Sequence, residues 1–147
     1  MLRNGTTTAA AYCTSHPQSV ESLFEEAARR NMRITAGKVM MDRNAPASLT
    51  DTPERAYDES RALIQRFDGV GRLSYAITPR FAPTSTEAQL EVAGALAAEN
   101  PDMAIQTHLS ENQAEIAFVA ELFPWARDYL DVYERFGLVR RLSLIHI

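Results

Sequence analysis

The chain has 147 residues, of which 46% are hydrophobic and 23% charged, and its formal net charge is −4. This is the composition of an ordinary soluble globular protein. No basic run or stripe is present, which argues against nucleic-acid binding and against an anionic membrane surface. No apolar run approaches the roughly 20 residues of a membrane span. Cys13 is the only cysteine, so no disulfide can form within the chain and a reducing cytoplasm is the expected location.

Short apolar runs alternate with longer amphipathic segments along the chain. The runs predict strands over residues 6–13, 34–41, 73–78 and 104–108. Helical spacing predicts helices over residues 19–31, 53–67, 85–100, 111–123 and 126–136. The N-caps expected for the first four are Ser19, Thr52, Thr84 and Ser110. This repeat of strand and helix is typical of an α/β protein with a parallel sheet.

Chemically capable side chains follow three of the predicted strands. Asp42 and Arg80 each come just after an apolar run, and His108 ends another, with Glu111 three positions later. Parallel α/β folds build their sites where the carboxyl ends of strands meet. A histidine at a strand tip suits a metal ligand, and a carboxylate beside it suits proton transfer. The pattern therefore indicates a metal-assisted hydrolase that grips a polar, heterocyclic substrate.

Each of these residues also has a structural explanation, which spacing alone leaves open. His108 could be a core histidine bonded to a backbone carbonyl, and Arg80 could be a solvated loop residue. Glu111 is expected in the first turn of a helix, where the helix dipole favours an acid in any case. Asp42 and Asn44 are expected to make turn and capping hydrogen bonds within their own loop. Several motifs are absent, namely a glycine-rich phosphate loop, Gly-x-Ser-x-Gly and Pro-Cys-x-x-Cys.

Four segments resemble, in order and spacing, those of the guanine deaminases of the amidohydrolase superfamily. They are Leu-Arg-Asn-Gly-Thr-Thr-Thr at 2–8, Gly-Lys-Val-Met-Met-Asp-Arg-Asn at 37–44, Thr-Pro-Arg-Phe at 78–81 and Gln-Thr-His-Leu-Ser-Glu-Asn at 106–112. The resemblance extends to about residue 141. It implies an α/β fold that is a partial (β/α)8 TIM barrel, contributing roughly strands two to five with their helices.

The resemblance also implies a role for each motif residue. His108 would be a Zn2+ ligand and Glu111 the proton shuttle, while Arg80 and Phe81 would bind the guanine base. The implied activity is that of a zinc-dependent hydrolase, in which a zinc-activated water converts guanine to xanthine and ammonia. The implied partner is this small molecule, with neither nucleic acid nor a membrane involved, and family members are commonly homodimers.

The chain departs from the family at both ends. The family's His-x-His pair on the first barrel strand would lie before residue 1, and its metal-binding aspartate on the last strand would lie beyond residue 147. We therefore interpret residues 1–141 as a fragment of the catalytic barrel domain, expected to be inactive alone. Residues 142–147 resemble a translated sequencing adapter, and we interpret them as a non-native tail. His146 is accordingly not assigned as a ligand, because the alanine that precedes the family's sixth-strand histidine is absent.

Two other interpretations remain open on the sequence. Within the superfamily, the chain could come from another aminohydrolase, or from a chlorohydrolase that acts on a triazine-like ring. Outside it, the chain could be a complete, non-catalytic α/β binding module. The Arg80-Phe81 pair favours guanine over the triazine alternative.

Overall fold

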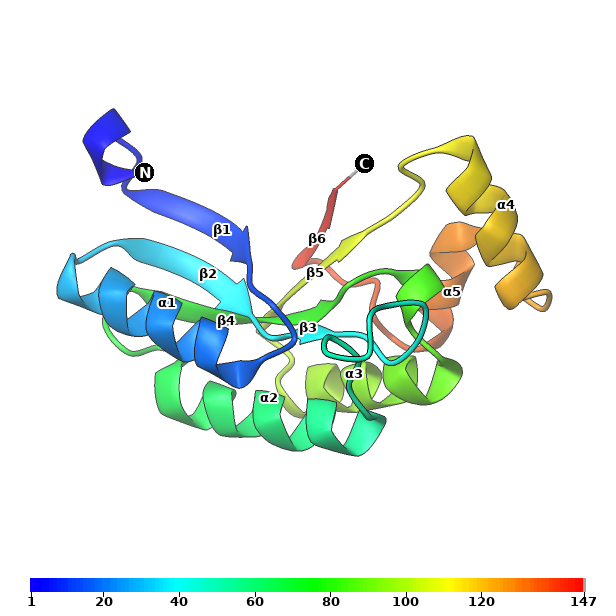
Figure 1. Ribbon diagram of the computed structural model, residues 1–147, viewed down its shortest axis with the longest axis horizontal. Helices are drawn as coiled ribbons and strands as arrows, with labels where there is room; N and C mark the ends of the chain where they lie inside the picture. The colour runs from blue at the N-terminus through cyan, green and yellow to red at the C-terminus, as the bar shows by residue number, and fades with distance from the viewer. Residues whose placement is uncertain (147) are drawn as a thin grey trace.

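The structure is a computed structural model that describes residues 1–146, with side chains described up to Ser143. Its strands form one parallel sheet in the order β1-β2-β4-β5-β6, with β3 also paired to β4 (Figure 1). The strands are β1 (Thr8–Tyr12), β2 (Arg33–Gly37), β3 (Val39–Met40), β4 (Leu73–Pro79), β5 (Ala104–His108) and β6 (Ser143–His146). The predicted α/β class and parallel sheet are confirmed.

Residues 1–146 also form five α-helices and two short 3-10 helices, of which all but η1 lie between strands. The α-helices are α1 (Pro17–Arg29), α2 (Pro53–Phe67), α3 (Glu87–Glu99), α4 (Gln113–Leu122) and α5 (Tyr129–Arg135). The 3-10 helices are η1 (Leu2–Asn4) and η2 (Ala82–Thr84). Figure 1 shows α1, α2 and α3 along one face of the curled sheet, while β1 and β6 rise at its two edges. Within residues 1–146, no helix has the length and apolar character needed to cross a membrane.

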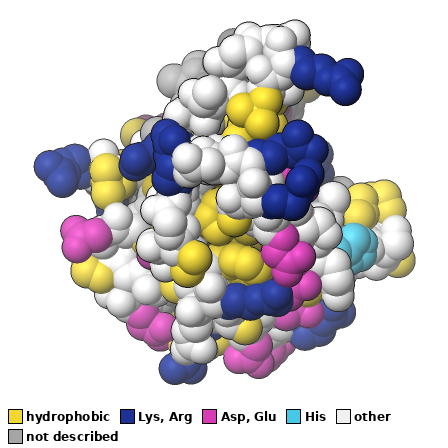
Figure 2. Space-filling view, turned by 90° about the vertical axis from the view of Figure 1, so that its left-hand side faces the viewer, with side chains coloured by type: hydrophobic (Ala, Val, Ile, Leu, Met, Phe, Trp, Pro, Cys, Tyr) yellow, Lys and Arg dark blue, Asp and Glu magenta, His cyan; other side chains and the backbone are white. Residues whose placement is uncertain are grey.

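The core lies between the sheet and its helices, in two apolar clusters. One contains Phe24 of α1 and Ile34 of β2, and the other contains Leu90 of α3 and Ile105 of β5. A parallel sheet that is covered on its faces reads as continuous apolar runs, which is why its strands are visible in the sequence. Each large apolar side chain buried in this way contributes about 1.5–3 kcal/mol. The surface away from the core mixes acidic and basic side chains, as the face in Figure 2 shows.

The helix starts agree only partly with the predicted caps. Thr52 caps α2 as predicted, and its hydroxyl accepts the hydrogen bond of a first-turn N–H at 3.3 Å. The prediction for Ser19 is wrong, because α1 begins two residues earlier at Pro17, whose fixed φ suits the first turn. The prediction for Thr84 is also wrong. Thr84 belongs to η2, and α3 is capped instead by Thr86.

A close backbone approach at Gly37 divides the strand predicted over residues 34–41. A Cβ at this position would lie 1.8 Å from the carbonyl oxygen of Ala76 and 2.7 Å from the Thr78 hydroxyl. Only glycine permits this approach of β2 to β4. The pairing with β4 stops after Ala36 and resumes at Val39 in β3.

The curl of the sheet is held by a side chain that crosses its concave side. The Gln106 amide of β5 donates to the Thr78 hydroxyl of β4 at 3.0 Å and to the Ala11 carbonyl of β1 at 3.1 Å. Strands β2 and β4 stand between β1 and β5 in the sheet order. One side chain can therefore reach both only because the sheet bends strongly, as a barrel wall does.

The sixth strand was not predicted. Backbone pairing of β6 with β5 runs in parallel from Ile105↔Ser143 to His108↔His146. The backbone of His146 thus stands opposite His108 in the register, while its side chain lies outside the described part of the structure. The assignment of residues 142–147 as a non-native tail stays a prediction.

Candidate functional site

The predicted clustering of Arg80 and His108 is confirmed, because the strands that carry them are neighbours. Arg80 follows β4 directly and His108 is the last residue of β5. The His108 backbone N–H donates to the Arg80 carbonyl at 3.1 Å, and His108 Nδ1 lies 2.9 Å from the same oxygen. A carbonyl can only accept, so Nδ1 is the donor, and the neutral form of the ring that fits this contact has its lone pair on Nε2. This is the tautomer that a metal-ligating histidine adopts when a carbonyl orients it.

Aromatic rings surround the imidazole. The Tyr12 ring of β1 lies 4.6 Å from the His108 ring between centroids, and the Phe81 ring lies edge-on at 6.2 Å. Burial, followed by the nearby Tyr133 and Glu111, raises the pKa of the Tyr12 hydroxyl, which therefore stays protonated at neutral pH. Tyr12 thus presents a neutral hydroxyl and an apolar face beside the histidine.

A pocket of about 320 Å³ opens where the carboxyl ends of the strands meet. The Arg80 guanidinium lies over the Phe81 ring, with Cζ 4.8 Å from the centroid, and Nη1 is 3.9 Å from the Met41 sulfur. The residues that line this pocket include Arg80, His108, Tyr12, Cys13, Met41 and Leu49. A small, largely apolar cavity with a fixed cation suits a planar heterocycle that carries an acceptor oxygen or nitrogen.

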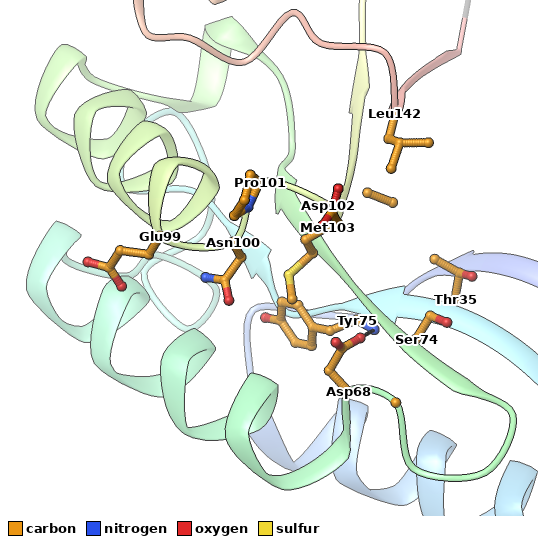
Figure 3. Close-up of a pocket in the computed structure, with 12 residues that line it drawn as sticks. Thr35, Asp68, Ser74, Tyr75, Glu99, Asn100, Pro101, Asp102, Met103 and Leu142 are labelled. Carbon is orange, nitrogen blue, oxygen red and sulfur yellow. Dashed lines mark hydrogen bonds between the residues drawn. The ribbon is translucent and has the colours of Figure 1, made fainter.

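A larger hollow of about 530 Å³ lies at the opposite, amino-terminal ends of the strands (Figure 3). Its lining includes Ser74, the second residue of β4, and Ala104, the first residue of β5. Three acidic residues, Asp68, Glu99 and Asp102, also line it. The Asp68 carboxylate accepts the Tyr75 backbone N–H at 2.8 Å, which explains it as a structural group. Parallel α/β folds carry their chemistry at the carboxyl ends, so we place the candidate site at the smaller pocket.

Glu111 lies in the turn between β5 and α4, outside the helix. The predicted Ser110 cap is wrong, because Asn112 caps α4 by accepting the Glu115 N–H at 2.9 Å. Ser110 adopts a left-handed φ of 55°, which turns the chain sharply after β5. Glu111 is exposed, and among residues 1–146 the pocket lining includes neither it nor Phe81. Glu111 therefore precedes the N-cap of α4 by one residue, instead of lying in the first turn as predicted.

Asp42 and Asn44 bind the segment after β4, not their own loop as predicted. The Asp42 carboxylate accepts the Thr86 backbone N–H at 2.8 Å and the Thr86 hydroxyl at 2.5 Å. The Asn44 amide donates to the Pro83 carbonyl at 2.7 Å. These bonds anchor residues 82–86, which directly follow Arg80 and Phe81. The Met-Asp-x-Asn motif thus supports the segment that carries Arg80 and Phe81, without lining the pocket through Asp42 or Asn44.

A buried ion cluster at Lys38 holds the other side of the pocket, and sequence reasoning missed it. The fully buried Lys38 ammonium pairs with the Asp51 carboxylate, and Glu59 lies 3.3 Å away. Asp51 closes the loop that begins at Met41, and the Asp51 N–H donates to the Met41 carbonyl at 2.8 Å. Leu49 of this loop lines the pocket. A lysine inside an apolar strand was the available signal, since a buried lysine needs a partner.

Among the side chains that the structure describes, residues 1–143, no group of three or more His, Cys, Asp and Glu lies together in a way that could hold a metal ion. His108 fits as one ligand, because its orientation and tautomer are set by the Arg80 carbonyl. A zinc site usually needs at least three protein ligands. The remaining ligands would therefore have to come from outside these residues.

The chain matches known proteins along nearly its whole length. The profile of the Amidohydrolase family matches residues 1–146. The guanine deaminase of Escherichia coli K12 is 57% identical over 138 residues, which is 94% of this chain and 31% of that protein. Its solved structure superimposes with a TM-score of 0.96 at 55% identity, covering 97% of this chain and 34% of that one.

More distant structures share the fold. The guanine deaminase of C. acetobutylicum, solved with guanine bound in its active site, matches with a TM-score of 0.93 at 32% identity, covering 98% of this chain and 35% of that one. A triazine hydrolase from Arthobacter aurescens matches at 0.86 with 18% identity, covering 98% and 34%, which shows the fold alone. The chain spans about a third of the length of these relatives, and the predicted partial barrel is confirmed.

Proposed function

The chain belongs to the amidohydrolase family, and we propose that it is a segment of a guanine deaminase, which hydrolyses guanine to xanthine and ammonia. One observation carries the proposal. The backbone carbonyl of Arg80 orients the ring of His108, so the residue proposed to bind the base and the residue proposed to bind the metal are held together by one direct hydrogen bond. The similarity to guanine deaminases, one of them solved with guanine bound, supports the same substrate.

Arg80 and Phe81 are proposed to bind the guanine base. A guanidinium offers a planar set of directional donors, which suits the carbonyl edge of a purine. Its stacking on Phe81 restricts the side chain before the substrate arrives. The ring of Phe81 also meets the imidazole of His108 edge-on, so Phe81 lies beside the pocket that Arg80 and His108 line.

His108 is proposed to hold zinc through Nε2, with further ligands from outside this chain. Zinc would supply the Lewis acidity that makes a water molecule nucleophilic near neutral pH. The contribution of this chain is orientation, because Nδ1 is anchored on the Arg80 carbonyl and the Tyr12 ring packs beside the imidazole.

Glu111 is proposed to move the proton. It lies in the turn directly after β5, three residues from His108 and outside α4. The left-handed Ser110 redirects the chain at this point, and backbone strain of this kind is concentrated at functional sites. Glu111 would deliver a proton to the ring nitrogen next to the reacting carbon, and then to the departing amine.

The first test is to read the source DNA beyond both ends of this frame and assay the full-length product for xanthine and ammonia. We expect wild-type turnover on guanine, and expect Glu111→Gln to keep its zinc but lose at least about 10²-fold in kcat, as general acid–base groups do. Glu121→Gln, an exposed acid on α4, is the matched control and should match wild type. Retained activity in Glu111→Gln would remove this residue from the mechanism.

Substrate choice is tested by offering a chlorotriazine and other aminated heterocycles to the same protein. The stacked Arg80-Phe81 pair supports guanine as the preferred substrate. Preference for a chlorotriazine would replace this proposal with a chlorohydrolase. We further propose that the full-length enzyme is cytoplasmic and works as a homodimer. Sedimentation of the full-length product would measure its oligomeric state.

A further inference from the structure

One buried hydroxyl, that of Tyr133 in α5, joins the two strand ends that carry the site. It accepts the backbone N–H of Ala82 at 3.0 Å and donates to the carbonyl of His108 at 2.8 Å. The Thr107 hydroxyl donates to it at 3.2 Å. The residue itself is 1% exposed.

Two of these bonds have a single assignment, because the Ala82 N–H can only donate to the Tyr133 hydroxyl and the His108 carbonyl can only accept its proton. The Thr107 hydroxyl lies 3.2 Å from the Tyr133 oxygen and 3.2 Å from the Arg80 carbonyl, so its one proton is shared between these two acceptors. A phenylalanine would fill the same space but would leave a buried N–H and a buried carbonyl without this partner. The hydroxyl therefore contributes something that packing of the ring cannot replace.

The partners of Tyr133 come from different elements of the site. Ala82 follows Phe81 and is the first residue of η2, so a hydrogen bond to its N–H anchors the segment that carries Arg80 and Phe81. His108 ends β5 and faces the same pocket as Arg80. A single rigid group that binds both segments fixes the distance between them.

On these grounds we propose that Tyr133 is a positioning residue, which sets the substrate-binding segment after β4 against the His108 end of β5. The inference rests on the proposed function for the nature of the chemistry. Binding of the base by Arg80 and Phe81 can survive a small shift between the two segments, whereas hydrolysis needs the base placed correctly against His108. Loss of the hydroxyl should therefore lower kcat more than it raises KM.

The test compares Tyr133→Phe with Val132→Ala in the full-length protein. Val132 is the preceding residue of α5 and is fully buried in the apolar cluster, so its truncation weakens the helix packing without removing a hydrogen bond to either strand end. Both variants are assayed on guanine well below their melting temperatures, so that the folded fraction is the same. We expect Tyr133→Phe to lose at least tenfold in kcat with KM changed less than threefold, and Val132→Ala to stay within twofold of wild type.

Hydrogen exchange of the backbone gives a readout that is independent of activity. Peptides covering residues 80–84 and 106–110 should exchange faster in Tyr133→Phe than in Val132→Ala. Should Tyr133→Phe not fold, Thr107→Val removes the contacts of the Thr107 hydroxyl with Tyr133 and with the Arg80 carbonyl, and should show a smaller loss of kcat in the same direction. Equal kcat and equal exchange in Tyr133→Phe and Val132→Ala would overturn the inference. Wild-type protein without turnover on guanine would overturn the proposed function instead, and the exchange comparison would still decide the role of Tyr133.

Discussion

Replacing Gly37 by alanine should damage both the stability and the chemistry of the site. The added Cβ would lie 1.8 Å from the Ala76 carbonyl oxygen, and β2 must move away from β4 by about 1.2 Å before this contact reaches 3.0 Å. The obstacle is backbone, which cannot rotate aside. Overpacking costs up to about 3 kcal/mol, and the lower entropy of the unfolded alanine variant returns about 0.4–1 kcal/mol. The expected net loss is therefore about 2 kcal/mol.

The same movement reaches the pocket through Thr78, which lies 2.7 Å from the added Cβ and accepts the Gln106 amide. Displacements of about 1 Å in an active site can cost about 10²-fold in rate. Urea unfolding and guanine kinetics of the full-length protein measure the two effects. Ala27→Val, which overpacks the buried side of α1 away from the rim, should lose stability but keep kcat/KM. Gly37→Ala with stability within about 0.5 kcal/mol of wild type and unchanged kcat/KM would refute the reasoning.

Two further outcomes follow from buried groups near the pocket. Asp51→Asn leaves Glu59 as the carboxylate partner of the buried Lys38 ammonium, so the free energy of unfolding in urea should fall by about 3–5 kcal/mol. The exposed Asp58→Asn is the control and should leave it unchanged. A fall of less than about 1 kcal/mol in Asp51→Asn would show that the Lys38 cluster contributes little to stability. Burial raises the pKa of the Cys13 thiol, and the Ser19 hydrogen bond offsets this only in part. At pH 7, iodoacetamide should therefore alkylate Cys13 more slowly than it alkylates a small free thiol, and the rate should rise with pH. Bound guanine should slow the alkylation further. Reaction at the rate of a free thiol would show that the thiol is solvated.

The fold was predictable from the sequence where burial on both faces of a strand leaves a plain apolar run. The run at 73–78 matches β4 to within one residue, and every side chain of β4 except Ser74 is buried. Helix starts were less predictable, because several serines and threonines stand near each start and only tertiary contacts select one. Thr86, and not Thr84, caps α3, since Asp42 holds Thr86 from another loop.

The candidate site was predictable as a set of residues but not as an arrangement. The position of Arg80 and His108 at strand ends follows from the parallel topology, which the pattern of elements already indicates. The bond between His108 Nδ1 and the Arg80 carbonyl does not, because it depends on where two backbones end relative to each other. The Lys38–Asp51 pair and the bonds of Tyr133 are likewise long-range contacts without a local pattern.

The end of β5 is fixed from both faces of the sheet, and this two-sided support explains why so many polar residues accompany one histidine. Alternate residues of a strand point to opposite faces, so Gln106 and His108 share one face and Thr107 has the other. On the concave side, Gln106 bonds to β4 and β1. On the helix side, Thr107 meets Tyr133 of α5. The proposed role of His108 as a metal ligand requires one fixed orientation of its ring, and bonds on both faces of β5 hold the strand that carries it.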